Sequence, residues 1–176
     1  MTAPDDIKTR LQLANHAAEL GCRTAVEVGV HLGKHAAEML KRCPSLEKLY
    51  CIDPWDGPHY TWLMPNDDRY AECQKRLAPF GDRVELIRTT SMEAVERFEI
   101  DSLDWVFIDA QHWYEYVLED IRAWWPKCRT GGLFAGHDYY KRHGCRVPDA
   151  VKDFFTPLGR EWHVTTERHA SWWLVK

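Results

Sequence analysis

The stretch RTAVEVGVHLGKHAAEMLKR, residues 23–42, decides the fold of this chain. It begins with a short β-branched run at 23–29, passes through a turn with two glycines, and ends in a helical segment at 34–42. Pro44 follows closely, and the backbone before a proline disfavours the helical conformation, so the helix is expected to end there. The stretch therefore predicts a strand, a tight turn and a helix in succession.

The rest of the chain repeats this alternation. A first helix is expected from Ile7 to Ala18, where apolar residues recur at helical spacing and Gly21 follows. The further expected strands are 46–53, 83–88, 103–109, 132–136, 161–165 and 170–175, and the further expected helices are 67–77, 91–98, 114–125 and 149–155. Only a few residues separate the last two strands, which predicts an antiparallel hairpin. We therefore expect a single α/β domain over residues 1–176, a three-layer α-β-α sandwich around a Rossmann-like, mostly parallel seven-stranded sheet.

Composition and charge exclude several classes of protein. Of the 176 residues, 45% are apolar and 28% are charged, which excludes the disordered class. The formal charge of -4 disfavours general attraction to nucleic acid. No apolar run approaches the roughly 18 residues of a membrane-spanning helix, and the first ten residues lack the pattern of a secretory signal. We expect a cytoplasmic protein whose six cysteines are reduced thiols.

Residues at the carboxyl ends of parallel strands form the ligand site in sheets of this kind. Gly29 and Gly33 let the chain after the first strand turn tightly and approach a ligand closely. The dinucleotide fingerprint G-x-G-x-x-G is not satisfied, because His31 stands where its middle glycine would be. Asp53 ends the second strand 20 positions after Gly33, a spacing that suits hydrogen bonds to ribose hydroxyls. An aspartate that merely starts the loop before Pro54 is the alternative.

Together these features resemble the class I S-adenosylmethionine-dependent methyltransferases, whose first motif is acidic-x-Gly-x-x-x-Gly and whose second strand ends in an acid. Three further segments, FIDAQHWYE at 107–115, AWWP at 123–126 and GGLFAGHDY at 131–139, resemble the small bacterial-type O-methyltransferases of the family 24-like group. That group is often assigned to sugars or other small hydroxyl acceptors. The resemblance covers nearly the whole chain and implies methyl transfer from S-adenosylmethionine to a hydroxyl of a small acceptor.

The resemblance also implies which residues bind the cofactor. The predicted contacts are Glu27, Gly29, Val30 and Gly33 around the methionine part, Asp53 at the ribose, Trp55 over the cofactor, Ser91 and Met92 at the adenine, and Asp109 at the end of the fourth strand. Two of these residues have alternatives. Ser91 would serve equally well as the cap of the short helix it opens. Trp55 would serve equally well as one of nine tryptophans that fill the core.

A base and a metal site follow from the same resemblance. In the catechol and caffeoyl-coenzyme A type enzymes, an Asp after the fourth strand binds a divalent metal and a Lys three positions later removes the hydroxyl proton. Here those positions hold Asp109 and His112, and a neutral imidazole is a reasonable base near pH 7. After the fifth strand those families have Asp-Asn, whereas this chain has His137, Asp138 and Tyr139. The implied ligands for Mg²⁺ or Mn²⁺ are Asp109, His137 and Asp138.

Tyr139 departs from the family pattern and leaves metal dependence open, and the alternative for Asp138 is a carboxylate that only accepts hydrogen bonds from backbone amides. The acceptor is expected to be a small molecule, a sugar or an anionic metabolite. The aromatic-rich segment 55–68 is a candidate lid or a packing element, and the basic set Lys141, Arg142, His143 and Arg146 is a candidate anion-binding loop or a solvated one. Homo-oligomerisation stays open. The competing functions are a nicotinamide-dependent oxidoreductase and a non-catalytic binding module on the same fold.

Overall fold

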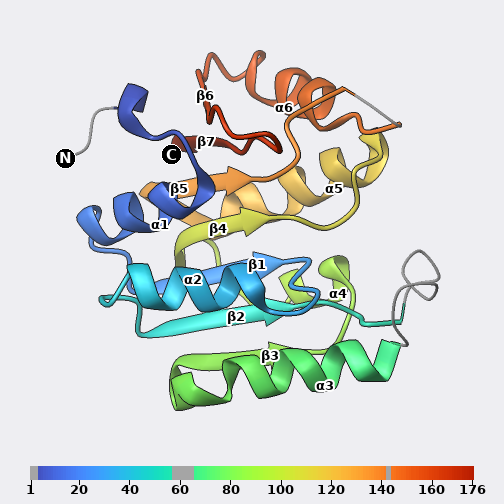
Figure 1. Cartoon of the computed structure of the whole chain (residues 1–176). Coiled ribbons are helices and arrows are strands. Elements are labelled where there is room, and N and C mark those ends of the chain that lie inside the picture. The colour runs from blue at the N-terminus through green and yellow to red at the C-terminus, as the bar shows by residue number, and fades with distance from the viewer. Residues whose placement is uncertain (1–3, 57–65, 142–143) are drawn as a thin grey trace.

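The computed structural model describes residues 4–56, 66–141 and 144–176. Seven strands form one sheet in the order β3-β2-β1-β4-β5-β7-β6 (Figure 1). The strands are β1 (Thr24–Val28), β2 (Lys48–Ile52), β3 (Val84–Ile87), β4 (Leu103–Ile108), β5 (Cys128–Gly136), β6 (His163–Val164) and β7 (Trp172–Val175). The first five are parallel to one another, whereas β7 is antiparallel to β5 and β6 is antiparallel to β7. The predicted mostly parallel sheet with a terminal hairpin is confirmed.

Helices pack on both faces of this sheet and complete the three layers (Figure 1). One face carries α1 (Arg10–Glu19), α2 (Lys34–Arg42) and α3 (Asn66–Leu77), and the other carries α4 (Ser91–Val95), α5 (Tyr114–Trp124) and α6 (Val147–Phe155). Short 3-10 turns occupy Pro4–Asp6, Ala78–Arg83 and Trp125–Lys127. None of the helices in the described ranges combines the length and the apolar character that crossing a membrane requires.

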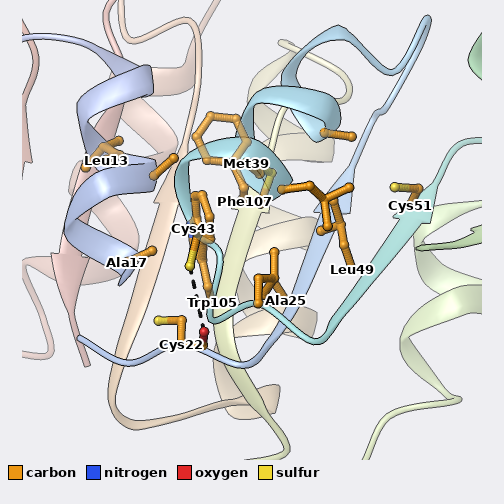
Figure 2. Packing of buried hydrophobic residues seen from close by; sticks show 14 of the residues in the cluster. Leu13, Ala17, Cys22, Ala25, Met39, Cys43, Leu49, Cys51, Trp105 and Phe107 are labelled. Carbon is orange, nitrogen blue, oxygen red and sulfur yellow. Dashed lines mark hydrogen bonds between the residues drawn. The ribbon is translucent and has the colours of Figure 1, made fainter. Parts of the chain in front are cut away.

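The core is divided between the two faces by the two-residue period of the strands. On β4, Trp105 and Phe107 pack with the α1, α2 and α3 layer, whereas Val106 and Ile108 pack with the α4, α5 and α6 layer. Figure 2 shows the first of these clusters, where Trp105 and Phe107 lie between the helices and the sheet. The six cysteines are all buried and unpaired, in agreement with the expected reduced thiols.

Several element boundaries differ from the expected ones for local reasons. The first helix begins at Arg10 rather than near Ile7, because Thr9 and Gln12 form a reciprocal capping box there. The fifth strand begins at Cys128 rather than at residue 132, and its register with β4 shifts across the pair Gly131 and Gly132. Glycines are common at such irregularities, so a glycine pair inside a strand is easily read as the turn before it.

The other corrections concern the last elements. Helix α6 begins at residue 147 rather than 149, with Pro148 in its first turn, where a missing N–H removes no helical hydrogen bond. Strand β6 is two residues long instead of the expected 161–165. The hairpin itself is present, and its β7 strand buries Trp172, Trp173 and Leu174.

The strand order places the candidate site. Strand β1 lies at the centre, with β2 on one side and β4 on the other, so the chain crosses over between these neighbours. In open α/β sheets the crevice outside the carboxyl ends of the strands at such a switch point is the usual binding site. The segments after β1, β2, β4 and β5 all leave from this edge.

Candidate active site

The turn after β1 depends on glycine at two positions. Gly29 has a φ of 91° and Gly33 a φ of 69°, both in the left-handed region. A Cβ on Gly29 would lie 2.1 Å from the carbonyl oxygen of Asp109, so only glycine lets the ends of β1 and β4 come this close. A Cβ on Gly33 would meet the Sγ of Cys73 at 3.0 Å at the start of α2. The predicted tight turn is therefore present, and its close neighbours in the structure are the backbone at Asp109 and the side chain of Cys73.

Glu27 is buried beneath this turn, and only one of its two carboxylate oxygens has a hydrogen-bond partner among the described residues. Its Oε1 lies 3.1 Å from the Nδ1 of His35, and its Oε2 has no hydrogen-bond partner among the described residues. Burial raises the pKa of Glu27, and the imidazole of His35 opposes that rise. A buried acceptor without a donor is destabilising, which makes this oxygen a candidate for a ligand's N–H group. Sequence reasoning did not identify His35, which lies on the first turn of α2 and carries no motif signal.

Asp53 and Trp55 connect the turn after β1 with the turn after β2. The carboxylate of Asp53 accepts hydrogen bonds from the N–H of His31 at 2.9 Å and of Trp55 at 2.7 Å. The indole Nε1 of Trp55 donates to the carbonyl of His31 at 2.7 Å, and its ring packs on Tyr70. Burial raises the pKa of Asp53, although both backbone donors act against it. Trp55 is 2% exposed, so it occupies the core position that was its alternative.

The start of α4 corrects one expectation for Ser91. The helix cap is Thr90, whose side chain accepts from the N–H of Glu93 in a capping box. Ser91 instead donates to the Oδ1 of Asp120 and accepts from the Nε1 of Trp124 at 2.9 Å. Met92 lies beside it and lines a shallow hollow over α5. Both predicted adenine contacts are partly exposed, and Met92 lines that hollow.

A cluster of charged side chains follows β4 and β5. The Nδ1 of His137 lies 3.4 Å from an oxygen of Asp109 and 3.4 Å from an oxygen of Asp138. One donor atom from each of these three residues lies within 4.8 Å of the others. The structure therefore brings together the three residues that were expected to bind a metal, although they come from two strand ends.

His112 belongs to the same cluster through Asp138. Its Nε2 lies 2.9 Å from the Oδ2 of Asp138, and its side chain is 34% exposed. The Asp138 carboxylate raises the pKa of His112 against the opposing effect of burial. The alternative in which Asp138 accepts only from backbone amides is wrong, because its carboxylate contacts the rings of His112, His137 and His169.

The protonation of this cluster follows from its geometry. Burial opposes the charged form of His137, but the carboxylates of Asp109 and Asp138 outweigh it and raise the pKa of His137 to about 9. Burial also acts against ionised Asp138, yet the neighbouring imidazoles His112 and His137 lower its pKa well below the usual range. Near neutral pH, an imidazolium between two carboxylates is the expected state. A metal ion at these residues has to displace that proton.

Two members of the cluster were missed in the sequence. The Nη1 of Arg10 lies 3.5 Å from the Oδ2 of Asp109, and the Nδ1 of His169 lies 3.3 Å from the Oδ1 of Asp138. The first pair is 99 residues apart in sequence. Arg10 starts α1 and His169 precedes β7, so only the tertiary fold brings them to this edge and no local pattern marks them.

The basic segment, for which an anion-binding loop and a solvated loop were the alternatives, is already paired in part. Lys141 and Arg146 both form ion pairs with Asp149 on α6, and Arg146 also lies over the ring of Tyr114 at 5.9 Å. One carboxylate thus offsets only part of their combined positive charge. Arg142 and His143 lie outside the described residues, as does most of the aromatic-rich segment, residues 57–65.

Comparison with known proteins identifies the family to which the chain belongs. Residues 26–139 match the model of a family described as a methyltransferase domain. An uncharacterized protein, y4gI, from Sinorhizobium fredii is 25% identical over 135 residues, which is 71% of this chain and 14% of that protein. The chain thus spans a small part of that relative.

Solved structures with similar folds include several methyltransferases. An O-methyltransferase family protein from Burkholderia thailandensis gives a TM-score of 0.69 at 14% identity, over 94% of this chain and 55% of that chain. The O-methyltransferase NovP gives 0.69 at 17% identity, over 95% of this chain and 79% of that chain. The O-methyltransferase from Bacillus cereus, in complex with SAH, gives 0.65 at 13% identity, over 97% and 84%. At these identities the likeness shows the fold alone.

Proposed function

The chain belongs to the methyltransferase domain family, and from this premise we propose that it transfers the methyl group of S-adenosylmethionine to a hydroxyl of a small acceptor, of the sugar or glycoside class. One observation carries the proposal: a Cβ on Gly29 would overlap the backbone carbonyl of Asp109, so the turn after β1 lies directly beside the end of β4. This contact puts the glycine turn and the imidazole–carboxylate cluster at one crevice. We also propose that residues 1–176 act as a single methyltransferase domain.

The residues around the turn suit the cofactor. The unpartnered Oε2 of Glu27 offers an acceptor for the ammonium of the methionine part. The backbone of Gly29, Val30 and Gly33 would line that part, because glycine allows the main chain to come close to a ligand. Asp53 keeps lone pairs for the ribose hydroxyls beside its two backbone donors, since a carboxylate accepts about four hydrogen bonds. When bound, the cofactor supplies a methyl group activated on a sulfonium.

His112 is the proposed base. Asp138 contacts its Nε2, which leaves Nδ1 as the ring atom that accepts the acceptor's hydroxyl proton. The carboxylate holds the ring in place and stabilises the imidazolium that forms, as an orienting acid does in other acid–base pairs. A raised pKa makes His112 a stronger base. It also reduces the fraction of His112 that is neutral at a given pH. Asp109 would complete this catalytic set from the end of β4.

Asp109, His137 and Asp138 are the proposed ligands of a divalent cation. Two carboxylates and one imidazole with donor atoms within 4.8 Å of one another fit Mn²⁺, and fit Mg²⁺ through the oxygens. A cation held there would lower the pKa of a coordinated acceptor hydroxyl. The protein's own contribution is to hold the three ligands on two rigid strand ends beside His112.

Calorimetric titration with S-adenosylhomocysteine and with NAD tests the proposal. We expect S-adenosylhomocysteine to bind and NAD not to bind. Glu27→Gln should weaken S-adenosylhomocysteine about 10-fold, because hydrogen bonds to charged groups contribute roughly 1.5–3 kcal/mol. Glu99→Gln, at an exposed position, is the matched control and should change nothing. Binding of NAD alone would favour the oxidoreductase, and binding of neither would favour the non-catalytic module.

A further inference from the structure

Arg10 is held at the edge of the crevice by both ends of the chain. Its backbone N–H donates to the Oε1 of Glu167 at 2.6 Å, and the N–H of Thr166 donates to the carbonyl of Lys8 at 3.0 Å. The start of α1 therefore lies against the loop between β6 and β7 (Figure 1). The backbone at Arg10 is thus held by one carboxylate and by one neighbouring backbone pair.

The guanidinium of Arg10 has few hydrogen-bond acceptors within the protein. Asp109 is the one group that its guanidinium contacts among the residues the structure describes, through Nη1 at 3.5 Å. That distance is long for a charge-assisted hydrogen bond, which is typically about 2.7–2.9 Å. A guanidinium has five N–H donors, and the side chain is 32% exposed. Most of its donors are therefore available to a ligand.

Glu27 and Arg10 reach the crevice from the same face of the sheet. Glu27 pairs in register with Phe107, and Asp109, which Arg10 contacts, lies two residues further along that chain. Phe107 packs in the α1, α2 and α3 layer, the layer to which Arg10 belongs. Burial raises the pKa of Glu27, and the guanidinium is close enough to oppose that rise slightly. An acid with a spare acceptor and a cation with spare donors thus flank the Gly29 turn.

This pairing matches the two charges of a free α-amino acid group. The Oε2 of Glu27 suits an ammonium, and the planar fork of an arginine suits a carboxylate. We propose that Arg10 binds the α-carboxylate of the methionine part of the cofactor, while Glu27 accepts from its α-ammonium. This inference rests on the proposed function and adds a residue that lies before the glycine motif.

The test compares two ligands that differ in the amino-acid group alone. S-adenosylhomocysteine carries that group and methylthioadenosine lacks it, while both contain the thioether nucleoside. By calorimetry we expect Arg10→Gln to weaken S-adenosylhomocysteine about 10-fold and to leave methylthioadenosine within about twofold. Arg10→Lys, which keeps the charge without the planar fork, should give an intermediate loss.

Arg97→Gln is the matched control, because Arg97 is an exposed arginine with one carboxylate partner, Glu85, at the β3 edge. It should leave both affinities unchanged. An equal loss for both ligands in Arg10→Gln would mean that Arg10 only supports the fold, and an unchanged S-adenosylhomocysteine affinity would mean that Arg10 does not contact the carboxylate. Either result overturns the inference while the proposed function stands. A wild-type protein that binds neither ligand would overturn both.

Discussion

The glycine turn after β1 and the charge cluster after β4 and β5 lie at the same edge of the sheet but are built differently. The turn is made of backbone, and its shape follows from left-handed glycines and one close contact at Gly29. The cluster is made of side chains, and Arg10, Asp109, His137, Asp138 and His169 join it from four separate segments. A local rule therefore produces the glycine turn, whereas tertiary packing produces the cluster, which contains the proposed base, the proposed cation ligands and Arg10.

The largest expected effect comes from adding one methyl group to the turn. In Gly29→Ala, the new Cβ would overlap the carbonyl of Asp109 at 2.1 Å. We expect a loss of about 3–5 kcal/mol in the free energy of unfolding, combining overpacking with left-handed strain, and no measurable binding of S-adenosylhomocysteine. Urea denaturation and calorimetry measure the two quantities.

Gly159→Ala separates strain from crowding. Gly159 also has a positive φ, of 62°, but a Cβ there meets nothing within 4 Å. It should destabilise the protein by about 1–2 kcal/mol from strain alone and leave binding intact. Equal losses in the two alanine variants would show that contact with β4 is unimportant, and the turn would then be no more constrained than an ordinary loop.

The second largest effect belongs to the cluster. We expect His112→Ala to reduce kcat about 10²- to 10⁴-fold, the usual contribution of a positioned general base, while the affinity for S-adenosylhomocysteine changes less than about twofold. The rate of methyl transfer is measured from the amount of S-adenosylhomocysteine released. Gln111→Ala, at the exposed neighbouring position, is the control. A parallel loss of binding and turnover in His112→Ala would contradict the division between the turn and the cluster.

The sequence predicted the turn well because its determinants are neighbours along the chain. The strand before Gly29, the glycine at Gly33 and the acid at Asp53 are each readable, and parallel strands bring their carboxyl ends to one edge. The same rule correctly placed Asp109 beside His137 and Asp138, since β4 and β5 are adjacent.

The sequence could not reveal contacts made by segments that meet only in the folded chain. Arg10 and His169 belong to a helix start and a hairpin loop, and neither position carries a pattern that names Asp109 or Asp138 as its partner. Composition alone could not tell whether Trp55 covers the cofactor or fills the core, and its burial in the structure indicates the core. The pairing of Lys141 and Arg146 with Asp149 likewise depends on where α6 begins.

The affinity for a metal ion should depend on pH, whereas the affinity of the glycine turn for S-adenosylhomocysteine should not. The pKa of His137 is raised to about 9, so below that pH each cation bound has to release one proton. The apparent affinity for Mn²⁺ should therefore rise about 10-fold per pH unit between pH 6 and pH 8, and S-adenosylhomocysteine affinity should stay nearly constant. Calorimetric titrations with MnCl₂ across this range measure the slope.

Matched variants locate that cation. Asp109→Asn should abolish the binding of Mn²⁺, whereas Asp153→Asn, which removes the partner of the Tyr114 hydroxyl, should not. A flat pH profile for Mn²⁺, or binding that survives Asp109→Asn, would mean that His137 and Asp109 are not its ligands. Turnover that persists after exhaustive chelation would remove the cation from the reaction.

The smallest expected effect concerns two adjacent residues, one held by local hydrogen bonds and the other by tertiary contacts. Thr90 caps α4 locally, and Thr90→Ala should lower the free energy of unfolding by about 1 kcal/mol. Ser91 is held by contacts with α5, and Ser91→Ala leaves the Oδ1 of Asp120 and the Nε1 of Trp124 without a partner, a loss of about 1–3 kcal/mol.

The pH dependence distinguishes these two alanine variants. Burial raises the pKa of Asp120 to about 6, above its ordinary value of 3.8, and the Ser91 hydroxyl limits that rise. Ionised Asp120 is therefore unfavourable in the fold, and its destabilising effect is absent below pH 3.8 and complete above pH 6. Without the hydroxyl the ionised form is still less favourable, so Ser91→Ala should be more destabilising at pH 8 than at pH 5, whereas Thr90→Ala should cause the same loss at both. Urea denaturation at the two pH values measures this, and a pH-independent loss in Ser91→Ala would show that Asp120 does not depend on the Ser91 hydroxyl.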